Sequence, residues 1–78
     1  MSKTEKLIAK ILAGRSVSYD EAEKILLHLG FDLNIESSHH SFRKKGYYKV
    51  ISIKKRSQLL QYQIKLLQEA LIKHGYKE

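Results

Sequence analysis

The sequence predicts a small α+β domain in which helices pack on one face of a three-stranded antiparallel sheet. Capping motifs followed by apolar residues at spacings of three and four predict the helices. The apolar period then changes to two within residues 31–36, which predicts strands. Helices before and after a run of strands are typical of this class. The expected order is helix, helix, three strands and helix, in a single domain over residues 1–78.

Two capping boxes predict the first two helices. In each box a serine precedes a glutamate by three residues, and an apolar stripe follows and ends at a glycine. The boxes are Ser2 with Glu5 and Ser18 with Glu21, and the glycines are Gly14 and Gly30. The first helix is expected over residues 3–13. This helix is an N-terminal extension, and three roles are open for it: packing on the domain, pairing two chains or binding a partner protein.

Alternation and composition predict the three strands. Phe31, Leu33 and Ile35 alternate with polar residues, so they should share the buried face of the first strand. The second strand is expected over residues 39–44, after a tight connection at Ser37 and Ser38. A turn at Lys45 and Gly46 leads to a third strand over residues 47–53, which is rich in aromatic and β-branched residues.

The last helix follows a basic loop at residues 54–57. Its apolar residues recur at helical spacing, and Gly75 is placed to end it. The stripe consists of Leu60, Ile64, Leu67 and Leu71.

Composition limits the possible partners. Lysine and arginine exceed acidic residues by 15 to 8, which gives a net charge of +7 and favours nucleic acid, with an anionic membrane surface second. Cysteine is absent, so a disulfide or a thiolate zinc site is excluded. No apolar run approaches the ~20 residues of a membrane span, and no secretory signal is evident. We therefore expect a cytoplasmic protein without a cofactor.

The second strand carries the candidate catalytic residue. Phe42 is its large apolar residue and should face the helices, together with His40 two positions earlier. His39, Ser41 and Arg43 then lie on the solvent face. An exposed imidazole near cations can transfer protons during RNA cleavage. The plainer interpretation is a surface histidine without chemistry.

His39 and His40 do not form a metal pair on this pattern, because adjacent strand residues point to opposite faces. We expect no metal site. The residues expected to contact RNA are Ser37, Ser38, Ser41, Arg43, Lys44, Lys45, Lys54, Lys55 and Arg56. Tyr47, Tyr48 and Tyr62 can stack on bases, although half-buried packing is the commoner role of tyrosine on a small sheet.

Three segments resemble the HicA-type toxins, the small RNA-cleaving halves of bacterial toxin–antitoxin pairs. Residues 37–42, Ser-Ser-His-His-Ser-Phe, resemble the family's Gly-Ser-His-His-x-Phe stretch. Residues 19–31 resemble its first helix with the Leu-Gly-aromatic exit. Tyr-Gln-Ile-Lys at residues 62–65 resembles the Tyr-Gln-Val-Lys start of its last helix. The resemblance covers about residues 18–75 in order and spacing.

The resemblance implies a fold like the double-stranded-RNA-binding domain and cleavage of mRNA independently of the ribosome. It also implies an acidic HicB-type antitoxin that covers the active site, and a catalytic role for His39. The family's glycine is Ser37 in this chain, and the proline often found after the third strand is absent. A homo-oligomer is possible, although the sequence does not indicate one.

Two alternatives remain open on the sequence. The chain can be a non-catalytic RNA-binding module, such as a degenerate toxin, and the replacement of glycine by Ser37 favours this interpretation. It can also be a basic domain that binds only an acidic protein.

Overall fold

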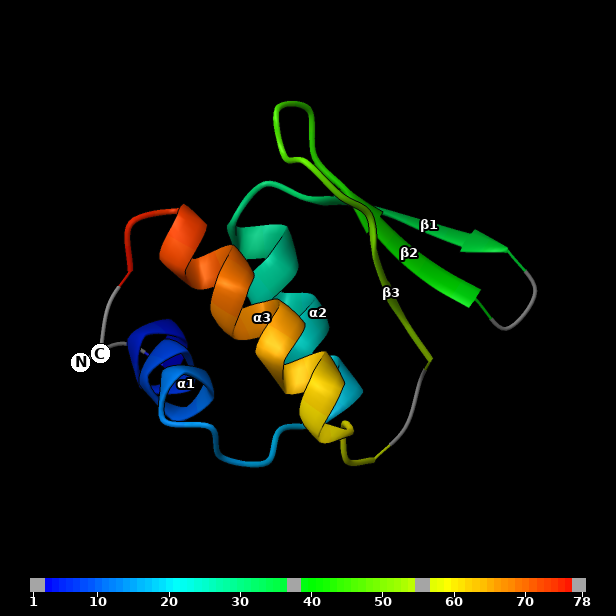
Figure 1. The fold of residues 1–78 in the computed structure, drawn as a ribbon. Helices are drawn as coiled ribbons and strands as arrows, with labels where there is room; N and C mark the ends of the chain where they lie inside the picture. Colours follow the sequence, from blue (N-terminus) through cyan, green and yellow to red (C-terminus); the bar gives the residue numbers. More distant parts are fainter. Residues whose placement is uncertain (1–2, 37–38, 55–56, 77–78) are drawn as a thin grey trace.

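The structure is a computed structural model that describes residues 3–36, 39–54 and 57–76. Helices and strands follow in the order α-α-β-β-β-α, as the sequence predicts (Figure 1). The helices are α1 (Lys3–Leu12), α2 (Tyr19–His28) and α3 (Gln61–Lys73). The strands are β1 (Asp32–Glu36), β2 (His39–Arg43) and β3 (Ile51–Ile53).

The sheet is antiparallel with the order β1-β2-β3, so β2 is central and β3 is an edge strand. Helices α2 and α3 lie on one side of the sheet, and α1 packs against these two helices (Figure 1). Phe42 of β2 and Ile51 of β3 are fully buried beneath the helices. The predicted α+β class and the predicted element order are therefore confirmed.

The core joins all three helices to the sheet. Its fully buried side chains come from α1, α2, α3, two strands and the loop between α1 and α2. Burial of each large apolar side chain stabilises the fold by about 1.5–3 kcal/mol. The largest are Phe42, Ile11, Ile25, Leu26, Ile51, Ile53, Leu67, Leu71 and Val17.

Helix α1 is an integral part of this core. Gln68 of α3 donates from Nε2 to the carbonyl oxygen of Ile11 at 3.0 Å, which satisfies one of the unpaired carbonyls at the end of α1. Gly14 follows with a φ of 77°, the left-handed conformation predicted for the end of this helix. Of the three roles left open for residues 3–13, packing on the domain is the one observed. The capping box predicted at Ser2 lies outside the described residues.

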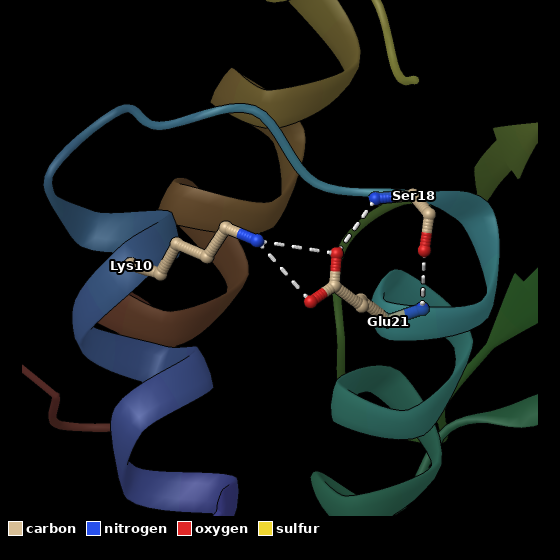
Figure 2. Close-up of polar contacts among 3 residues, drawn as sticks. All are labelled: Lys10, Ser18 and Glu21. Atoms are coloured by element: carbon tan, nitrogen blue, oxygen red, sulfur yellow. Dashed lines mark hydrogen bonds and ion pairs between the residues drawn. The ribbon is translucent and has the colours of Figure 1, made fainter. Parts of the chain in front are cut away.

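The second predicted capping box is present at the start of α2 (Figure 2). The Ser18 side chain accepts a hydrogen bond from the Glu21 backbone N–H at 3.2 Å, and Glu21 Oε1 accepts one from the Ser18 N–H at 3.0 Å. Lys10 of α1 pairs with Glu21 Oε2 at 3.2 Å. The hydrogen bond from the Ser18 backbone, followed by the contact with Lys10, holds the pKa of Glu21 below its ordinary value.

Replacing Glu21 with glutamine is expected to lower the free energy of unfolding by about 1 kcal/mol near pH 7, because the charge-assisted contacts at the helix start are weakened. A carboxyl whose pKa is depressed by folding stabilises above its ordinary value of 4.5, and this stability is lost as the pH falls through the lower folded-state value. Urea denaturation of both proteins between pH 7 and pH 3 measures this difference. A difference that does not shrink upon acidification would contradict the assignment.

The third strand is shorter than predicted. It begins at Ile51, whereas residues 47–50 were expected to extend it. The prediction is wrong there because these side chains contact residues outside the sheet. The Tyr47 ring packs edge-on against Phe31, with centroids 5.1 Å apart. Tyr48 donates a hydrogen bond to Glu69 of α3. Lys49 also pairs with Glu69 at 2.8 Å. The segment after the turn at Gly46 is thereby held against α3 before it joins the sheet.

Two apolar positions also differ from their predicted burial. Leu60 was assigned to the buried stripe of the last helix, but α3 begins at Gln61 and Leu60 is 42% exposed. Leu59 is buried in its place, and its N–H donates to the Val17 carbonyl at 2.9 Å. Ile35 lies on the helix side of β1, opposite His40, yet it is 55% exposed.

Candidate functional site

His39 begins β2 and is exposed, as the alternation predicts. The register pairs it with Glu36 of β1. Ser41 and Arg43 follow on the same side of β2, since every second residue shares a face. We call this side, which faces away from the helices, the open face of the sheet. Its described members are Asp32, Asn34, Glu36, His39, Ser41, Arg43 and Ser52.

The open face is not uniformly basic. The β1 row places exposed Asp32 opposite Arg43 and exposed Glu36 opposite His39. Among the described residues, the β3 side lacks such carboxylates. His40 pairs with Ile53, so the same register continued by one residue places Lys54 opposite His39. A phosphate would therefore be repelled on the β1 side and attracted on the β3 side. The sequence did not predict this asymmetry, which depends on strand pairing.

His40 points to the helix side, as predicted, where it contacts Tyr19 of α2. Its Nδ1 lies 2.6 Å from Tyr19 Oη, and the two rings meet edge-on with centroids 4.8 Å apart. Tyr19 Oη in turn donates to Glu23 Oε2 at 3.1 Å. Burial, and then the contact with Glu23, raise the pKa of Tyr19 well above its ordinary value. His40 is therefore the outer end of a hydrogen-bonded chain that leads into α2.

A cavity of about 360 Å³ brings the two histidines together at one end of the sheet. This volume lies at the small end of the range for ligand pockets, about 300–1,000 Å³. It opens where the chain leaves edge strand β3 for α3. The lining residues are His39, His40, Ser52, Ile53, Lys54, Leu60, Tyr62 and Gln63.

The start of α3 forms the far wall of the cavity. Gln63 is 3% exposed, and its Oε1 accepts a hydrogen bond from the Leu60 N–H at 2.8 Å. This contact satisfies one of the unpaired donors at the helix start, where no serine or aspartate is present. Tyr62, on the same turn, is 60% exposed at the cavity. Of these two adjacent residues, Gln63 therefore stabilises the start of α3, whereas Tyr62 presents an accessible aromatic ring.

The residues expected to contact RNA do not all gather at the cavity. Lys54 lines it, whereas Arg43 and Lys45 are exposed at the opposite end of β2. Lys44 is half-buried, donates to the Leu29 carbonyl at 2.7 Å and lies 2.7 Å from His74 Nε2. Its ammonium group is therefore engaged within the protein. Ser37, Ser38, Lys55 and Arg56 lie outside the described residues.

The three tyrosines differ in exposure. Tyr47 is half-buried against Phe31 and His74, so packing accounts for its ring. Tyr48 and Tyr62 are 61% and 60% exposed, which differs from the half-buried packing that the sequence favoured. Only Tyr62 among them lines the histidine cavity, so its ring is the one placed to stack on a base there.

Metal-ligating side chains do not gather in groups of three or more among the described residues. Within the same part of the chain, no helix is long and apolar enough to span a membrane. Comparisons with protein-family models, curated proteins and solved structures found no match to this chain. The assignment of function therefore depends on the residues and their geometry.

Sequence reasoning missed Tyr19 and Glu23 as neighbours of His40, and Gln63 as the residue that caps α3. Tyr19 and His40 are 21 positions apart, so no local spacing links them. A glutamine three residues after Leu60 is the position that a capping box uses, and this signal could have identified Gln63.

Proposed function

We propose that this chain is a cytoplasmic toxin-type endoribonuclease that binds and cleaves mRNA, with His39 as an acid–base catalyst. The observation that carries the proposal is the cavity that His39 and His40 share with Lys54. Imidazole can transfer protons near neutral pH, and a nearby ammonium group stabilises charge on the reacting phosphate. Self-cleavage of RNA through its 2′-hydroxyl requires these groups and no cofactor.

The net charge of +7 supports a polyanionic substrate. The acidic β1 row and the cationic Lys54 favour an approach of RNA from the β3 side, with Tyr62 in reach of a base. We further propose that the part from α2 to α3 adopts a fold of the double-stranded-RNA-binding type. A HicB-like antitoxin with an acidic surface would inhibit the protein by covering the cavity.

His39→Ala is expected to reduce RNA cleavage by about 10²–10⁴-fold, the contribution typical of a general acid or base. Because the His39 side chain is exposed, the substitution should leave the midpoint temperature of thermal unfolding unchanged within a few degrees. Cleavage of single-stranded RNA in the presence of EDTA, followed by gel electrophoresis, measures the loss. The matched control is His28→Ala, which removes another exposed histidine at the end of α2.

Equal cleavage by the wild type and by His39→Ala would exclude this mechanism. The second candidate function, a non-catalytic RNA-binding module, is favoured by Ser37 in place of the family's glycine. It predicts RNA binding that weakens steeply with salt and yields no cleavage products. Absence of RNA binding at low salt would leave a domain that binds only an acidic protein.

A further inference from the structure

The chain of hydrogen bonds behind His40 fixes the position of its protons. Tyr19 has a single hydroxyl proton, and the Glu23 carboxylate can only accept a hydrogen bond. The 3.1 Å contact with Glu23 therefore uses the tyrosine proton, and Nδ1 of His40 must donate to Tyr19 Oη across 2.6 Å. A neutral imidazole with its proton on Nδ1 carries a lone pair on Nε2. His40 is thus prepared as a base.

Packing keeps this arrangement rigid. Tyr19 is 2% exposed, and its edge-on contact with the imidazole restricts rotation of the His40 ring. The raised pKa of Tyr19, caused first by burial, keeps the hydroxyl protonated so that it continues to donate to Glu23. Apart from Tyr19, no described residue forms a hydrogen bond with the His40 side chain, and the ring lines the same cavity as His39.

We propose that His40 is the second catalytic residue of this site, taking a proton from the 2′-hydroxyl of single-stranded RNA while His39 protonates the leaving oxygen. Tyr19 and Glu23 are positioning residues that act through His40. This inference rests on the proposed ribonuclease function and assigns the two proton transfers of that reaction to different imidazoles.

The step balances without a redox reagent or a metal. The 2′-oxygen forms a bond to phosphorus as its proton passes to Nε2 of His40, and the bond from phosphorus to the 5′-oxygen breaks. The imidazolium of His39 gives its proton to that 5′-oxygen. The products are a 2′,3′-cyclic phosphate and a 5′-hydroxyl end.

The two environments support this division of roles. When His40 accepts a proton, Glu23 stabilises the positive charge through Tyr19, as a carboxylate does in a catalytic triad. His39 is exposed on the open face beside Lys54, so it can regain its proton from water after each turnover. A half-buried, oriented base and an exposed acid are thus adjacent on one strand and line the same cavity.

A substrate with sulfur in place of the 5′-bridging oxygen separates the two roles, because a thiolate leaves without protonation. Cleavage of this oligonucleotide and of the matched all-oxygen RNA is compared at the position where the wild type cuts. His39→Ala should lose about 10²–10⁴-fold on the oxygen substrate and recover most of its rate on the sulfur substrate. His40→Asn should lose a similar factor on both substrates.

Asparagine is chosen because its amide nitrogen can replace Nδ1 as the donor to Tyr19, although it has no group at the Nε2 position. Tyr19→Phe retains the buried ring but removes the hydroxyl, and kcat should fall at least about tenfold on both substrates with KM unchanged. Tyr47→Phe is the matched control, since its hydroxyl is buried without a hydrogen-bond partner among the described residues. Thermal unfolding of each variant monitors the fold.

Wild-type cleavage by His40→Asn, with His39→Ala inactive, would overturn this inference and leave the proposed function intact. Rescue of His40→Asn by the sulfur substrate would overturn the assignment of His40 as the base. A wild type that cleaves no RNA would overturn both the inference and the proposed function.

Discussion

Replacing Phe42 with alanine is expected to lower the free energy of unfolding by about 3–5 kcal/mol, the range for a fully buried phenylalanine. Phe42 is 0% exposed in β2, the central strand, and its ring centroid lies 6.3 Å from that of Tyr19. Small domains have total stabilities of about 5–15 kcal/mol, so this loss leaves little margin. Urea denaturation followed by circular dichroism measures it as a lower midpoint with an unchanged slope.

The control for this prediction is Val50→Ala, which shortens a side chain that is 44% exposed just before β3. Its effect should stay within about 0.5 kcal/mol, as for surface substitutions generally. Phe42→Ala with a loss below about 1 kcal/mol would show that the sheet does not pack on the helices as described. The burial of Phe42 shows which side of β2 faces the helices, and therefore places Ser41 and Arg43 on the open face. The same result would thus contradict the assignment of the open face.

Replacing Ile11 with alanine is expected to lower the free energy of unfolding by about 2–5 kcal/mol. Ile11 is 0% exposed in α1, where it joins the core formed with α2 and α3. The size of the effect tests whether the N-terminal helix belongs to the folded unit. If this helix did not pack on the domain, the substitution would change the free energy of unfolding very little. Chemical denaturation of the full chain measures the difference.

Ile72→Ala is the matched control, because the same atoms are removed from an α3 side chain that is 58% exposed. We expect a change within about 0.5 kcal/mol. Equal effects of the two substitutions would contradict the packing of α1 on the other helices.

The elements that the sequence predicted well are those whose signal is local. The capping box at Ser18 uses groups three residues apart, and the stripe that follows Glu21 repeats at the helical period. The third strand was overestimated because residues 47–50 have high strand propensity, whereas their observed positions depend on Phe31 and Glu69. Strand propensities differ by less than about 1 kcal/mol per residue, so such tertiary contacts can override them.

For the candidate site, the sequence by itself separated His39 from His40, because strand geometry sends adjacent side chains to opposite faces. Only the tertiary structure decided what each histidine meets. Strand pairing sets Glu36 and Lys54 on the two sides of His39, and helix packing brings Tyr19 to His40 from 21 residues away. Alternation is a property of the local backbone, whereas these neighbours depend on how distant segments pack, and no short pattern in the chain contains that information.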